Sequence, residues 1–121
     1  MRYDSPDRAM RELTQNNVAG AASATMTKFH TYAKSRLKRV SALIATAGTN
    51  ATAGVDIFVG TTSVGAITVG TNTAGVTADS GALDVEVPAA GMIEIKGKAN
   101  SATMVLSLSC VLQPAGDADV D

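Results

Sequence analysis

The sequence predicts an all-β protein, a compact antiparallel β-sandwich or small barrel preceded by an extended N-terminal arm. Two observations favour this fold class. Between Val40 and Pro114, short segments alternate apolar with polar residues, as in Leu83–Val87 and Met92–Lys96, which is typical of strands with one buried face. Residues that favour turns separate these segments at intervals of about 8–12 residues, as in a sandwich or barrel. The length of 121 residues suits a single domain.

The strands that this pattern predicts are, in order, Val40–Thr46, Val55–Val59, Ala66–Val69, Leu83–Val87, Met92–Lys96 and Thr103–Leu112, with a less regular one near Gly75–Ala78. Asp84 and Glu86 share one face of their strand, as do Glu94 and Lys96, because side chains alternate between faces. We expect these two charged faces to pair across strands, a contact worth at most about 1 kcal/mol.

Residues 1–25 are expected to form an arm that orders on a partner. The stretch Asp4 to Asp7 could begin a short helix, because it combines capping side chains with a proline and an acid near the first turn. Met10 and Leu13 alone would not hold that helix in water. The polar and small residues of 15–25 favour an extended linker. Deletion of 1–25 is therefore expected to leave a folded body.

Residues 26–39 are expected to be extended and basic, since Lys34, Arg36 and Lys38 alternate with smaller or apolar residues. The predicted organisation is an arm with a basic extended segment (1–37), a β-sandwich body (38–114) and an acidic C-terminal tail (115–121).

The net charge of −1 hides an asymmetry along the chain. Residues 1–40 carry eight basic and three acidic side chains, a net +5, whereas residues 41–121 carry two basic and eight acidic ones, a net −6. A basic front and an acidic body could attract one another between subunits, or the front could bind an acidic partner.

The residue inventory argues against an enzyme. His30 is the only histidine and has no carboxylate, cysteine or second histidine at ligand or triad spacing, so no metal or cofactor is expected. Cys110 lies in an apolar run and is interpreted as a small core residue; a single cysteine excludes an intramolecular disulfide. The N-terminus lacks the apolar core of a signal peptide, and no segment is apolar enough to span a membrane.

A polar arm and a basic extended segment precede a body rich in Gly, Thr, Ala and Val, such as residues 45–54 (ATAGTNATAG) and 62–75 (TSVGAITVGTNTAG). In this organisation the whole chain resembles the small decoration (cement) proteins of tailed bacteriophage capsids. The resemblance implies a jelly-roll or tulip-like body on the capsid exterior of the virion, made in the host cytoplasm. The implied partners are the major capsid protein and sister copies, a trimer being one arrangement, with the arm bridging capsomers.

In this interpretation basic side chains of the first 38 residues pair with acidic groups, and aromatic and leucine side chains provide apolar anchors. The candidate partner-binding residues are Tyr3, Arg8, Arg11, Leu13, Phe29, Tyr32, Lys34, Arg36 and Lys38.

Two alternatives remain. Basic residues interleaved with aromatics in 28–39 are a feature of single-stranded nucleic-acid binding, but the body is acidic and no RNA- or DNA-binding motif is present, so nucleic acid is the less favoured partner. Another head or tail component of a phage would share the same sequence character.

Overall fold

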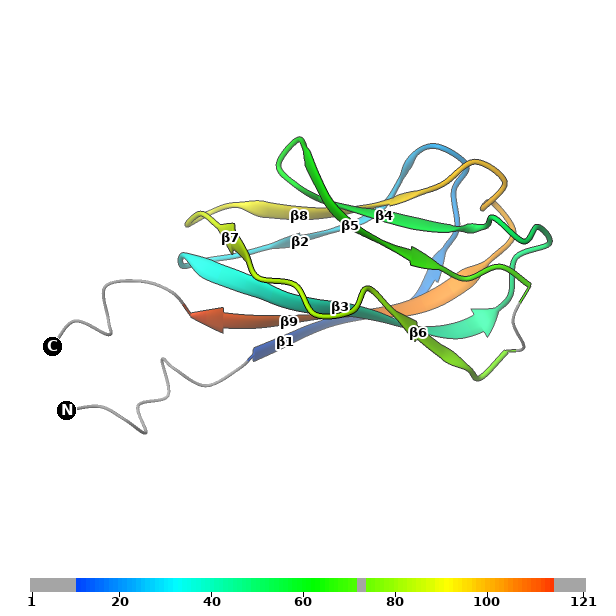
Figure 1. Ribbon diagram of the computed structural model, residues 1–121, viewed down its shortest axis with the longest axis horizontal. Helices are drawn as coiled ribbons and strands as arrows, with labels where there is room; N and C mark the ends of the chain where they lie inside the picture. Colours follow the sequence, from blue (N-terminus) through cyan, green and yellow to red (C-terminus); the bar gives the residue numbers. More distant parts are fainter. Residues whose placement is uncertain (1–10, 72–73, 115–121) are drawn as a thin grey trace, which may run out of the picture.

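The computed structural model describes residues 11–71 and 74–114, which form a β-sandwich of two antiparallel sheets packed face to face (Figure 1). The all-β prediction is confirmed, and no helix occurs among these residues. The first sheet has the order β1 (Arg11–Ala19), β9 (Val105–Pro114), β3 (Ser35–Thr46) and β6 (Thr77–Asp79), with β7 (Val85–Val87) also pairing with β3. The second has the order β2 (Thr25–His30), β8 (Met92–Gly97), β4 (Gly54–Val59) and β5 (Thr62–Thr68).

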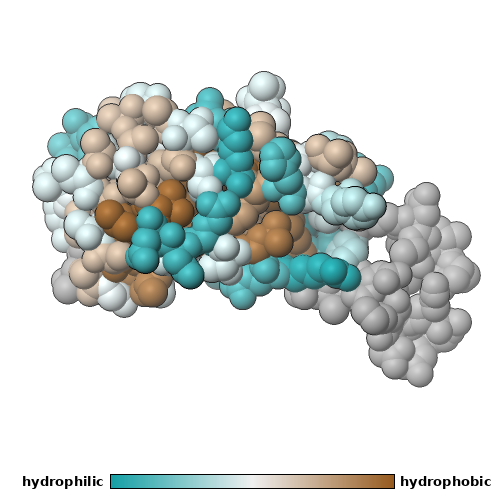
Figure 2. Space-filling model, turned by 180° about the vertical axis from the view of Figure 1, so that it is seen from behind, coloured by the Kyte–Doolittle hydropathy of each residue, from teal (hydrophilic) through white to brown (hydrophobic). Residues whose placement is uncertain are grey.

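The core lies between the two sheets and follows the alternation of the long strands. On β9, every second residue from Leu106 to Leu112 is buried, and Ile93 and Ile95 of β8 face them from the second sheet. Each sheet has one apolar face and one more polar face. The apolar faces are buried because the two sheets pack against each other. Figure 2 shows hydrophobic and hydrophilic residues intermixed on the side that it presents, without a broad hydrophobic face.

The sandwich begins at Arg11, well before the predicted boundary at residue 38. Strand β1 pairs with β9 on both sides of a bulge, so the prediction that residues 11–19 belong to an arm outside the body, with a linker from residue 15, is wrong. The partly buried side chains of β1 are Leu13, Gln15 and Val18, and the register shifts between Gln15 and Val18, where Asn17 has a φ of 54°. This bulge interrupts the alternation of apolar and polar residues, and Gln15 places an amide on the inner face. The sequence pattern therefore does not indicate a strand here. The helix start predicted at Asp4 to Asp7 lies outside the described residues.

The segment that joins β1 to β2 is packed against the connection between β8 and β9 and is not an open linker. The Gly20 N–H donates to the carbonyl of Met104 (2.7 Å), and the Gly97 N–H donates to the carbonyl of Ala24 (2.9 Å). A Cβ added at Gly97 would lie 1.8 Å from the carbonyl oxygen of Ala21, so only glycine permits this approach. Residues 20–24 therefore belong to the sandwich.

The basic stretch 26–39 is two strands and not one. Strand β2 ends at His30, the chain crosses between the sheets, and β3 begins at Ser35 in the other sheet.

Two of the predicted charged strand faces lie in different sheets, because β7 pairs with β3 in the first sheet while β8 lies in the second. The expected pairing of Asp84 and Glu86 with Glu94 and Lys96 is therefore wrong.

Candidate functional site

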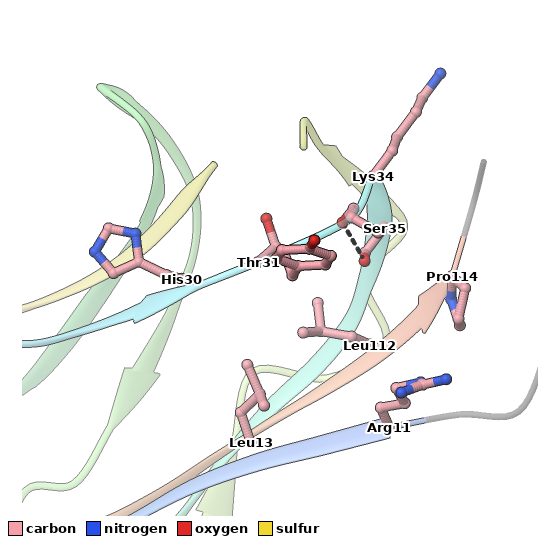
Figure 3. Close-up of a pocket in the computed structure, with 10 residues that line it drawn as sticks. Arg11, Leu13, His30, Thr31, Lys34, Ser35, Leu112 and Pro114 are labelled. Atoms are coloured by element: carbon pink, nitrogen blue, oxygen red, sulfur yellow. Dashed lines mark hydrogen bonds between the residues drawn. The ribbon is translucent and has the colours of Figure 1, made fainter. Parts of the chain in front are cut away.

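A groove of about 470 Å³ opens at one end of the sandwich, between strands β1 and β9 and the turn that joins β2 to β3 (Figure 3). It is lined by Arg11, Leu13, His30, Thr31, Tyr32, Ala33, Lys34, Ser35, Leu112 and Pro114. Because these residues come from three parts of the chain, only the folded sandwich brings them together.

The floor of the groove is formed by the ends of two neighbouring strands. Arg11 is paired in register with Leu112, and Leu13 with Cys110, so Arg11 and Leu13 lie on the inner face of β1 beside the inner face of β9. In Figure 3, Leu13 and Leu112 point from these strands toward the turn above them. Leu13 stays partly exposed, and the groove therefore has an apolar floor that solvent reaches.

The turn above the floor is fastened to the rest of the fold. Thr31 is buried, its hydroxyl donates to the carbonyl of Pro88 (2.9 Å), and its N–H donates to the carbonyl of Gly91 (3.1 Å). The Ser35 hydroxyl donates to the carbonyl of Ala33 (2.9 Å) and closes the turn. The backbone of this turn is therefore held in place before any partner binds.

Tyr32 projects from this fastened turn with 97% of its surface exposed. An aromatic side chain on a held backbone offers a large contact area at a low entropy cost, and tyrosine is enriched among the residues that dominate binding energy. Leu43 on β3 and Val76, at 46% and 44%, are the other large hydrophobic residues exposed in the described part of the chain.

The described lining of the groove carries basic side chains and no acidic one. Arg11 and Lys34 are among the ten described residues that line it. The Lys34 Nζ lies 3.4 Å from a carboxylate oxygen of Glu86, with about half of each side chain exposed, and an ion pair so exposed is weak enough to exchange with another anion. The groove therefore suits a ligand with carboxylates and a small apolar group.

The structure gathers only part of the predicted partner-binding set at this groove: Arg11, Leu13, Tyr32 and Lys34. Phe29, expected to be an anchor on the surface, is instead in the core with 4% of its surface exposed, because it faces inward from β2. Tyr3 and Arg8 lie outside the described residues.

Arg36 and Lys38 lie outside the groove and contact an acid of their own chain. The Arg36 Nε is 2.6 Å and the Lys38 Nζ 3.2 Å from the same carboxylate oxygen of Asp84. The hydrogen bond from Arg36, followed by that from Lys38, is the main reason that the pKa of Asp84 lies below its usual range. The hydrogen bond between Arg36 and Asp84 also raises the pKa of Arg36. Arg39 similarly contacts Asp79, at 2.9 Å. Much of the positive charge of the predicted basic segment is therefore balanced within the fold.

The sequence did not single out the other residues of the groove. The sequence offers His30 only as a candidate catalytic or ligand residue, Leu112 only as the end of a predicted strand, and Pro114 only as the end of the predicted body. Strand register could have indicated Leu112. If residues 11–19 are taken as an edge strand beside the last strand, Arg11 pairs with Leu112 and their side chains lie on the same face of the sheet.

Other chemistry is sparse in the part of the chain that the structure describes. It contains no cluster of three or more metal-binding side chains and no helix long and apolar enough to cross a bilayer. The Cys110 thiol is buried, and burial raises its pKa to about 12, so it is no nucleophile near neutral pH. Comparisons with protein-family models, with curated proteins and with solved structures found no match to this chain.

Proposed function

We propose that this chain is a structural virion protein that binds the outside of a phage capsid and stabilises it by bridging neighbouring capsomers. The observation that carries the proposal is the arrangement at the groove: Arg11 and Pro114, where the described chain starts and stops, both line it, beside the exposed Tyr32. Residues 1–10 and 115–121 therefore attach to the body at the groove. Contacts made by these segments and by the groove would act in one interface, and linked contacts strengthen one another.

The bridging arm in this proposal is shorter than the sequence suggested. Residues 11–30 belong to the sandwich, so residues 1–10, with Tyr3 and Arg8, remain to reach a neighbouring subunit. Ten extended residues reach at most about 35 Å, which is enough to cross from one small domain onto the next.

Contacts within the fold argue against single-stranded nucleic acid as the partner. A nucleic-acid site in residues 28–39 would use aromatic side chains for stacking and cations for phosphates. Here Phe29 is buried, and Arg36 and Lys38 already contact Asp84. The resemblance to cement proteins and the exposed Tyr32 at the groove support the capsid interpretation.

The test is binding to purified phage heads from the same source, with bound copies counted by mass spectrometry after gradient sedimentation. We expect many copies on each particle, strongly reduced by Tyr32→Ala or by deletion of residues 1–10. Leu43→Ala is the matched control, because Leu43 is also an exposed hydrophobic residue but lies on β3 away from the groove. Absence of the wild-type chain from the particles would refute the proposal, and equal loss with Leu43→Ala would refute the assignment of the groove.

A further inference from the structure

We propose that the groove binds the acidic C-terminal segment, residues 115–121, of a second copy of this chain. This contact is independent of the capsid proposal, because both partners are copies of the same protein and no shell takes part.

The chemistry of the segment matches that of the groove. Residues 115–121 read Ala-Gly-Asp-Ala-Asp-Val-Asp, so three side-chain carboxylates are close in sequence to one large apolar side chain, that of Val120. In an extended peptide Val120 points opposite to Asp119 and Asp121. Val120 can then contact the floor formed by Leu13 and Leu112, while the carboxylates on either side face the cationic rim.

The cations on the rim can form charge-assisted hydrogen bonds with such carboxylates. Arg11 and Lys34 lie on opposite walls of the groove, on β1 and on the turn before β3. Hydrogen bonds between ionised partners are stronger than neutral ones, and a planar guanidinium can bind a carboxylate with two of them. Lys34 would exchange its exposed contact with Glu86 for one with the bound segment, and Arg11, which also has a contact within the chain, would exchange that contact in the same way.

The direction of β9 favours a second copy over the same molecule. Strand β9 runs toward the groove end and leaves the sandwich at Pro114, which is itself part of the wall (Figure 1). A chain that continues this direction moves away from its own groove and toward a molecule that faces the same end. The seven residues can span about 23 Å, enough to enter a facing groove. Two copies related by a two-fold axis would exchange segments and make the contact twice.

The intrinsic fluorescence of the chain offers a direct reporter. The sequence has two tyrosines and no tryptophan, so a Tyr3→Phe variant leaves Tyr32, at the groove, as the only strong emitter. We expect this variant to associate with rising concentration at low salt in sedimentation velocity, with a parallel change in Tyr32 emission. A chain that ends at Pro114 should stay monomeric. Salt should weaken the association because the charges are exposed.

A synthetic peptide of residues 115–121 then tests the site itself. Added to the chain that ends at Pro114, it should change Tyr32 emission in a saturable way, whereas the peptide with asparagine for all three aspartates should not. In the full-length chain, Asp117→Asn, Asp119→Asn and Asp121→Asn together should abolish association at unchanged length, and Lys34→Gln should weaken it. Leu43→Ala, outside the groove, should change nothing.

Three results would overturn the proposal. If the chain that ends at Pro114 associates as strongly as the full chain, the segment is not the partner. If truncation changes Tyr32 emission equally at all concentrations, the segment binds its own molecule and not a second copy. If neither truncation nor peptide changes the emission, the groove does not bind this sequence. Circular dichroism of each variant separates these results from loss of folding.

Discussion

Phe29 and Tyr32 provide the sharpest test of the structure, because the sequence offers both as surface anchors and the structure separates them. They are three residues apart, yet Phe29 is 4% exposed in the core and Tyr32 is 97% exposed at the groove. Phe29→Ala should therefore lower the free energy of unfolding, whereas Tyr32→Ala should leave stability unchanged and reduce binding.

The size of the Phe29 effect follows from its burial. Truncation of a buried phenylalanine to alanine costs about 3–5 kcal/mol, from lost transfer energy and the cavity left behind. For a domain of this size each kcal/mol corresponds to about 4 °C in Tm, so a fall of about 12–20 °C is expected. Tyr32→Ala buries and exposes almost nothing, and a surface change of this kind stays within about 0.5 kcal/mol.

The assay is urea unfolding followed by circular dichroism, with Tyr32→Ala as the matched control. Phe29→Leu keeps an apolar side chain in the core and should lose less stability, which provides a measurable variant if Phe29→Ala fails to fold. Stability of Phe29→Ala within about 1 kcal/mol of the wild type would refute the reasoning. The side chain would then not be in the core, and residues 26–39 would again be candidates for an extended binding segment.

Three further predictions follow from the same contacts. Deletion of residues 1–10 should leave a cooperative thermal transition by circular dichroism, whereas deletion of residues 1–19 should abolish it, because β1 covers one edge of the first sheet. Equal transitions in the two deletion variants would show that β1 is dispensable for folding. Ser101→Ala should lower the free energy of unfolding in urea by about 2 kcal/mol, because the buried Gly54 N–H loses the hydroxyl to which it donates at 3.0 Å. Ser63→Ala, at an exposed position, is the control. The Cys110 thiol, with its pKa raised to about 12, should resist a thiol reagent at pH 8 in the native protein and react in denaturant; rapid native labelling would contradict its burial.

The strands that the sequence predicts correctly are those whose alternation is uninterrupted. Strands β8 and β9 bury every second residue, and β4 buries Val55 and Ile57 on either side of the less buried Asp56, so period and burial agree there. Strand β1 escapes prediction for two physical reasons: Gln15 faces inward, and the bulge before Val18 shifts the phase.

Gln15 is tolerated on the inner face because β1 and β2 are the neighbouring edges of the two sheets. Its amide N–H donates to the backbone carbonyl of Lys28 (3.1 Å), and its amide oxygen accepts from the hydroxyl of Thr27. A polar side chain between the edges of two sheets can be buried when the neighbouring strand supplies its hydrogen-bond partners. The local sequence around Gln15 does not show which strand that is.

The groove was only partly predictable for a related reason. Tyr32 and Lys34 stand out in the sequence as an aromatic and a cation in a polar segment, and both line the groove. Their neighbours across the groove, Arg11 and Leu112, are separated from them along the chain by about 20 and 80 residues, distances that no local pattern links. Only the strand order, with β1 beside β9, brings these parts together.

The charge asymmetry of the sequence has a different meaning once the strands are paired. Arg36 and Asp84 are 48 residues apart in the chain, but the pairing of β3 with β7 brings them into contact. Arg39 and Asp79 meet in the same way through β6. The positive front and the acidic body therefore cancel along one side of the first sheet, which reduces the field available for a polyanion there. At the groove the described lining has cations and no acid, and the ion pair of Lys34 with Glu86 is exposed enough to exchange, so an anionic partner is favoured at this end of the sandwich.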